Sequence, residues 1–312
     1  LKQLEKNLSA EGYCQPKHTP GLWLRSTRGI SFTLVAGGFG VCCKSKADAE
    51  HLASALQEHY PTKAGWKGGR CAGIGLGWGY GSKALATSMK GCAKKALLQL
   101  KHGSPARPCR SPSKHEPPKH GQKVQLAPLG LSEPMAAAEA ACLQQACGKF
   151  LCYARAAGGT VLHALSGLAS MQSNGTQQAM QAMLHFLSYA AAHPGAEKAC
   201  KASGMILSIG SDAACLAAPQ ARSRAGGFHY LGNKSGSLMS GSAAAIAKIT
   251  KNAAASAAEA EVGALFMNAQ LAAPMRATLE ELGWPQPPAP MKAGSTAANG
   301  ITNGAAKQQR SK

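Results

Sequence analysis

A basic, proline-rich stretch between residues 101 and 131 sets the main limit on how this chain can fold. It holds six prolines among its lysines and arginines: Pro105, Pro108, Pro112, Pro117, Pro118 and Pro128. Because proline lacks an N–H donor and fixes φ, such a density blocks both helices and paired strands. We therefore predict an extended linker over residues 101–133. Its charge fits equally a segment that contacts phosphates and a simple soluble spacer.

The charge balance restricts the class of partner. Lysine and arginine number 34 against 14 acidic residues, a net charge of +20 over 312 residues. This balance favours polyanionic partners, of which nucleic acid is the natural one. Hydrophobic residues make up 45% but aromatic residues only 5%. Cores rich in alanine bury little area, so we expect low stability.

No part of the sequence predicts a membrane segment or a signal peptide. A membrane span needs roughly 20 consecutive apolar residues, and a signal peptide needs a cationic start before an apolar core. Neither pattern occurs. We expect an intracellular protein of the cytoplasm or nucleus, and we expect a fragment, because the chain opens on Leu1.

The first hundred residues predict a hairpin, a helix and a further strand. Residues 30–35 alternate as a strand, 36–38 form a tip and 39–43 return, while 48–60 carry helical periodicity. The glycine-rich segment 73–83 could cradle a phosphate, but it lacks the Lys-Ser or Lys-Thr ending. Its residues Ile74, Leu76, Trp78 and Tyr80 alternate with period two, which favours a strand with one apolar face.

The region from 134 to 194 predicts helices, because its apolar residues recur with helical spacing. One such face holds Leu143, Cys147, Phe150, Leu151 and Ala154. Beyond it, residues 205–209 form an apolar run of strand length, and Asp212 follows within a window free of other acidic residues. Residues 222–227 read as a turn that leads back into a second strand at 228–231. An ordinary hairpin with a solvated Asp212 and a metal ligand at a strand end both fit these residues.

Three segments in order carry a family resemblance. They are Ser211-Asp212-Ala-Ala, Ala221-Arg-Ser-Arg-Ala-Gly-Gly227 and Ala257-Ala-Glu-Ala-Glu-Val-Gly-Ala264. Together they resemble the ribonuclease H end of Ty1/copia-type retrotransposon Pol polyproteins. The resemblance implies a mixed sheet with Asp212 on a central strand, crossed by a helix that supplies a glutamate. It also implies two Mg²⁺ or Mn²⁺ ions that activate water and stabilise the leaving oxygen during cleavage of an RNA–DNA hybrid.

Two glutamates compete for the helix position, and periodicity separates them. Glu261 shares a face with Ala257 and Leu265, whereas Glu259 lies about 200° round the helix. We assign Asp212 and Glu261 as the residual catalytic and metal-binding residues, with Glu259 in solvent. The family motif also places its glutamate at the second position.

Other carboxylates of the family are replaced here. Residues 19–41 resemble the palm of copia-type reverse transcriptases, whose hairpin carries paired metal-binding aspartates where this chain has Gly37 and Gly38. The third ribonuclease H aspartate should follow a short strand near 289–298, where this chain has Gly294, and a fourth would lie beyond Lys312. One A-to-G change per codon accounts for each aspartate-to-glycine replacement, by decay of the gene or by change of the transcript.

The sequence therefore predicts a mixed α/β protein, a degenerate part of a Pol polyprotein. We expect a reverse-transcriptase palm and the start of the thumb at 1–100, the linker at 101–133, a helical thumb or connection region at 134–200, and a truncated ribonuclease H-like domain at 201–312. We expect no polymerase activity and an impaired nuclease, with Mg²⁺ or Mn²⁺ binding weakened, and RNA, DNA or their hybrid as partner. The alternatives are an active nuclease with further ligands, a non-enzymatic basic nucleic-acid-binding protein, and a chain without a stable fold.

Overall fold

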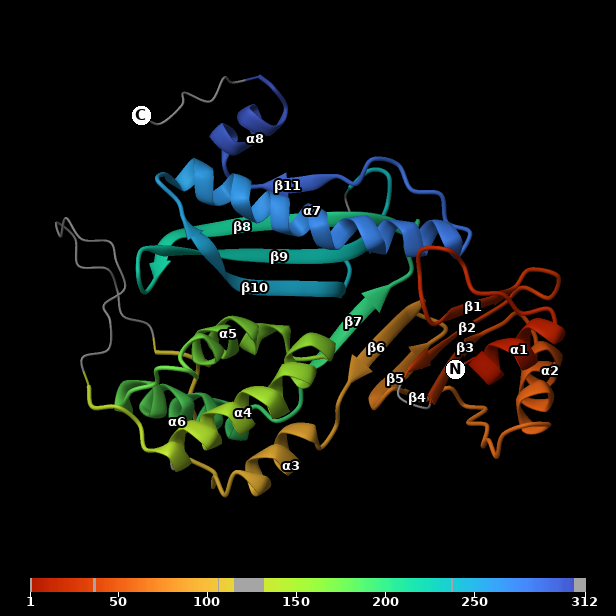
Figure 1. Ribbon diagram of the computed structural model, residues 1–312, viewed down its shortest axis with the longest axis horizontal. Helices are drawn as coiled ribbons and strands as arrows, with labels where there is room; N and C mark the ends of the chain where they lie inside the picture. Colours follow the sequence, from red (N-terminus) through yellow and green to blue (C-terminus); the bar gives the residue numbers. More distant parts are fainter. Residues whose placement is uncertain (1, 36–37, 106, 115–131, 237, 306–312) are drawn as a thin grey trace.

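The computed structural model shows a mixed α/β architecture (Figure 1). It describes residues 2–35, 38–105, 107–114, 132–236 and 238–305. Within these residues the strands form three separate sheets. The expected α/β class is thus confirmed at this coarse level. Gly37 and most of the proline-rich stretch lie outside the described residues, and residues 101–105 and 107–114 contain neither helix nor strand.

The first sheet contains the predicted hairpin. Its strands are β1 (Leu22–Arg25), β2 (Ile30–Val35) and β3 (Gly38–Cys42), all antiparallel, with Val35 opposite Gly38. Helices α1 (Lys2–Ala10) and α2 (Lys46–Gln57) complete the unit. Trp23 and Phe32 stack in its core, with ring centroids 6.0 Å apart, and Leu52 and Leu56 of α2 pack into the same core.

The second sheet joins residues that are far apart in the sequence. It runs β4 (Arg70–Cys71), β5 (Ile74–Gly79), β6 (Ala84–Ser88) and β7 (Glu197–Lys201), in that order. The glycine-rich segment is therefore a strand, as its alternation predicts. Ala86 of β6 pairs with Ala199 of β7, so the chain returns to this sheet after its helical region. The domain boundaries proposed above stay a prediction.

The helical region comprises α3 (Cys92–Gln99), α4 (Ala137–Ala156), a 3₁₀ turn η1 (Gly159–Val161), α5 (Leu162–Ser170) and α6 (Gln177–Ala192). Helices α4 to α6 lie within residues 134–194, where periodicity predicts them, and α3 precedes that range. Leu143, Cys147, Phe150 and Ala154 are buried in one core with Phe186 of α6, whereas Leu151, expected on the same face, is exposed. In the described part of the chain, no helix combines the length and the apolar character that a bilayer crossing requires.

The third sheet has the strand order β10-β9-β8-β11. Its members are β8 (Ile206–Ala218), β9 (Arg222–Gly232), β10 (Ser242–Ala253) and β11 (Met291–Ala293). Strands β8, β9 and β10 are antiparallel neighbours, and β11 runs parallel to β8. The long helix α7 (Ala257–Glu281) packs across β8 and β9, and α8 (Thr296–Thr302) follows β11 (Figure 1).

The predicted turn at 222–227 is wrong, because these residues belong to β9. Strand β8 continues past Asp212 to Ala218, and Asp212 pairs with Gly226. Within β9, Gly227 leaves no room for a side chain. An added Cβ there would lie 2.8 Å from Ile246 Cγ1 and would collide with Asn268. Glycine is needed there so that α7 can approach the sheet closely.

Candidate functional site

A pair of carboxylates lies where α7 crosses the third sheet. Asp212 sits within β8, which is a central strand because β9 and β11 flank it. Glu261 lies in the second turn of α7 and is only 8% exposed. The structure therefore brings together the two residues that sequence reasoning selected, although Asp212 lies inside a strand and not at its end.

The position of Glu261 follows from how α7 begins and how it is seated. Ser256 caps the helix by accepting a hydrogen bond from the N–H of Glu259 at 3.1 Å, and Glu259 Oε2 accepts from Ala255 N at 2.7 Å. Glu259 is exposed, as the helical periodicity predicts, and its carboxylate accepts from the backbone of the residue before the cap. Two residues further on, Glu261 turns inward.

Asn268 fixes α7 on the sheet. Its side chain is fully buried, and Nδ2 donates to Ser211 Oγ, to the carbonyl of Gly226 and to the carbonyl of Ala264, each at 3.0 Å. Ser211 directly precedes Asp212, so this contact sets the height of the helix relative to the carboxylate on β8. Asn268 Oδ1 is buried without a hydrogen-bond partner, so the hydrogen bonds of this side chain to the sheet come from its amide nitrogen alone.

The electrostatics of the pair favour a proton on Glu261. Burial raises the pKa of Glu261, the negative charge of Asp212 raises it further, and the backbone N–H of Ala213 opposes these effects. A hydrogen bond between the two carboxyl groups also raises this pKa, because it needs a proton on one of them. Glu261 Oε2 is buried without a hydrogen-bond partner. Such an oxygen atom can bind a proton or a cation.

Gly294 directly follows β11, the strand that runs parallel to β8. The ladder of these two strands ends with Ala293 opposite Ser211, the residue before Asp212. Gly294 is exposed, and an added Cβ would meet no atom within 4 Å. This position could therefore hold a third carboxylate without a clash.

The residues present do not fit a pair of divalent ions. Two Mg²⁺ ions need several oxygen ligands between them, and Asp212 and Glu261 are only two carboxylates. In the described ranges, no group of three or more histidine, cysteine, aspartate or glutamate residues is arranged to hold a metal ion. Gly38, at the start of β3, offers no side-chain oxygen at the hairpin of β2 and β3.

The sequence analysis did not predict that Trp78 and Tyr80 are exposed. The period-two pattern placed them on an apolar face, but both side chains are open to solvent. Nothing in their spacing distinguishes a covered face from an uncovered one.

Comparison with models of protein families, with curated proteins and with solved structures finds no match to this chain.

Proposed function

We propose that residues 201–312 are a nuclease-impaired ribonuclease H-like unit of a copia-type Pol polyprotein, and that the protein retains nucleic-acid binding. One observation supports this most strongly: α7 brings Glu261 to Asp212 on the central strand, and the exposed Gly294 directly follows the parallel strand β11, whose last residue lies opposite the neighbour of Asp212. A mixed sheet with Asp212 on a central strand, crossed by a helix that supplies a glutamate, is the arrangement that the sequence resemblance implies.

The chemistry of the unit follows from what its carboxylates can do. Cleavage of a phosphodiester by water needs negative ligands that hold metal ions on both sides of the phosphorus. Asp212 and Glu261 supply two such groups. When Glu261 is protonated, the pair carries only one negative charge. We therefore expect hybrid binding without efficient cleavage. The palm-like hairpin, with Gly38 in place of an aspartate, should not support primer extension.

The substitution Gly294→Asp would supply a third carboxylate to the site. Wild-type protein should leave an RNA–DNA hybrid almost intact in Mn²⁺, and Gly294→Asp should raise the cleavage rate by at least tenfold, because a third oxygen ligand then joins the pair. Gly294→Asn, which has the same size but no charge, is the matched control and should stay inactive. The measurement is cleavage of an end-labelled hybrid, followed on a denaturing gel.

Asp212 provides the decisive comparison. Adding Asp212→Asn to Gly294→Asp should abolish the gained activity, because one of the carboxylates that would hold the metal is lost. If Gly294→Asp instead remains inactive and fails to bind Mn²⁺ by calorimetry, the assignment of this site is wrong. If wild-type protein cleaves the hybrid readily and Asp212→Asn stops this cleavage, the hypothesis of an active nuclease with further ligands is favoured.

A non-enzymatic nucleic-acid-binding protein is the second candidate. The net charge of +20 favours it, because the charge does not depend on the carboxylate site. This function predicts binding of RNA and of hybrid whether or not cleavage can be restored.

A further inference from the structure

Two large aromatic side chains at the end of β5 are exposed to solvent. Trp78 is 47% exposed and Tyr80 is 83% exposed. Their rings stack on each other, with centroids 6.3 Å apart and planes 14° apart. Trp78 Nε1 also donates a hydrogen bond to the carbonyl of Gly68 at 2.9 Å. The pair therefore has a fixed orientation, and one face of Tyr80 stays open.

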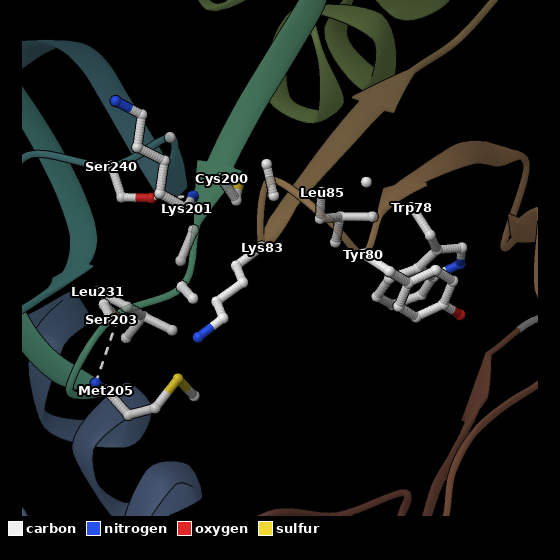
Figure 2. A pocket seen from close by; sticks show the side chains of 15 residues that line it. Trp78, Tyr80, Lys83, Leu85, Cys200, Lys201, Ser203, Met205, Leu231 and Ser240 are labelled. Atoms are coloured by element: carbon white, nitrogen blue, oxygen red, sulfur yellow. Dashed lines mark hydrogen bonds between the residues drawn. The ribbon is translucent and has the colours of Figure 1, made fainter.

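A cavity of about 430 Å³ adjoins this pair, between the second and third sheets. Figure 2 shows Trp78 and Tyr80 at one side of it, with the side chain of Lys83 extending toward Met205 at the other. Lys201 of β7 also lines the cavity. The side chain of Lys201 extends away from Lys83 and from the aromatic pair (Figure 2). The lining includes no aspartate or glutamate, so the ammonium group of Lys83 meets a surface without opposing charge. An anionic ligand fits this surface.

Lys83 is held in an unusual conformation. Its φ of 49° lies in the left-handed region, which costs a non-glycine residue of the order of 1 kcal/mol or more. Its N–H donates to the carbonyl of Tyr80 at 3.3 Å, and its carbonyl accepts from Ala202 N at 2.8 Å. These bonds tie Lys83 to the aromatic pair on one side and to the end of β7 on the other. The turn thereby fixes the backbone position from which the Lys83 side chain enters the cavity.

We propose that Trp78, Tyr80 and Lys83 form a binding site for single-stranded nucleic acid. A base stacks on the open face of Tyr80, and Lys83 contacts a phosphate of the same strand. Open aromatic rings together with cations are the combination that binds unpaired bases, and stacking tolerates any base because each has a π-face. A purely apolar ligand would leave Lys83 unmatched, and an anion without a flat ring would leave Tyr80 unused.

This site lies apart from the carboxylate pair, so it can be tested independently of the proposed nuclease ancestry. It deepens the proposed function by naming the strand form that is bound. Asp212 and Glu261 take no part in it. A failure to restore hybrid cleavage would therefore leave this inference untouched, and the converse also holds.

The test measures binding of labelled 12-nucleotide single strands by fluorescence anisotropy. One strand is RNA, one is DNA, and a third has the same DNA backbone with abasic positions. The variants are the double substitution Trp78→Ala with Tyr80→Ala, and its conservative counterpart Trp78→Phe with Tyr80→Phe. Trp284→Ala is the matched control, because Trp284 is also 47% exposed but lies just after α7, away from the cavity.

We expect the double alanine variant to bind RNA and DNA roughly tenfold or more weakly, since base stacking is lost. The phenylalanine variant and Trp284→Ala should bind like wild type. The abasic strand should bind all four proteins equally. Lys83→Ala should weaken the normal and the abasic strand alike, because its contact is to phosphate. Preference for RNA over DNA, or equal affinity, identifies which strand chemistry the site accepts.

Equal affinity of wild type and the double alanine variant for the normal strands would overturn the proposal. An equal loss on the abasic strand would do the same, since no base could then be stacking. A thermal melt by circular dichroism shows whether the variants fold. If the alanine variant is unfolded, the outcome is decided by Tyr80→Ala alone, which removes only an 83% exposed ring.

Discussion

Glu261 is a single buried carboxyl group whose proton affinity depends on one neighbour. Its pKa is raised by burial and by the charge of Asp212. The folded protein therefore binds this proton more tightly than the unfolded chain does. Its contribution favours folding below the ordinary pKa of glutamate and is lost as pH rises through the raised pKa of Glu261. At higher pH two negative charges face each other, and the pair destabilises the fold.

Glu261→Gln should consequently stabilise the protein at pH 7 to 8 and flatten its pH dependence of stability. We expect an increase in Tm of about 2–4 °C, the effect of roughly 1 kcal/mol in a domain of 150–250 residues. The measurement is thermal unfolding between pH 4 and 8 without divalent ions. Glu259→Gln, on the exposed side of the same helix, should give no such gain. A lower Tm for Glu261→Gln at pH 8 would contradict the repulsion between the two groups.

At the scale of the element, α7 is placed by its contact with a glycine of β9. Asn268 reaches the sheet only because Gly227 has no side chain, and Asn268 is held by three hydrogen bonds from its Nδ2 atom. The preceding residue, Gly226, has only the carbonyl of Asp212, at 3.7 Å, near an added Cβ. The two neighbouring glycines thus differ in their need to be glycine.

Gly227→Ala should destabilise the fold by about 1–3 kcal/mol, the usual effect of adding volume to a packed interface. Gly226→Ala should change stability far less, since its Cβ would make only ordinary contacts. Urea unfolding of the two variants gives the comparison. Similar stabilities would mean that α7 does not press on β9 as closely as the structure shows.

At the scale of the whole molecule, the three sheets are connected by contacts between distant residues. Glu281, at the end of α7, accepts hydrogen bonds from His18 N at 2.6 Å and Thr19 Oγ1 at 2.5 Å in the first unit. Strand β7 joins the second sheet to the helical region that precedes it. Over this frame the chain carries a net charge of +20, which should dominate its encounter with a polyanion.

Binding of single-stranded RNA should therefore weaken steeply with salt. We expect at least a tenfold loss of affinity between 50 and 200 mM NaCl, because each neutralised phosphate releases counterions. Filter binding across a salt series measures the slope. A peptide nucleic acid of the same base sequence, which has no phosphates, is the control and should bind poorly. A salt-independent affinity would exclude an electrostatic interface.

Local features of the sequence determined several elements correctly. The inward position of Glu261 and the exposure of Glu259 follow from the 3.6-residue period, which depends only on neighbours along the chain. The strand at 74–79 and the helices between 137 and 192 follow from periodicity for the same reason. The partnership of Asp212 with Glu261 was expected from the family resemblance, and the structure places them together.

Only the tertiary structure decided what depends on partners far along the chain. The pair Gly226 and Gly227 predicted a turn, yet both residues lie in a strand that pairs with β8. Asn268 packs against Gly227. Trp78 and Tyr80 alternate like a buried face but are exposed, since no element of the described chain covers them. Period and charge are properties of the chain itself, whereas exposure and close approach belong to the packing of one element on another.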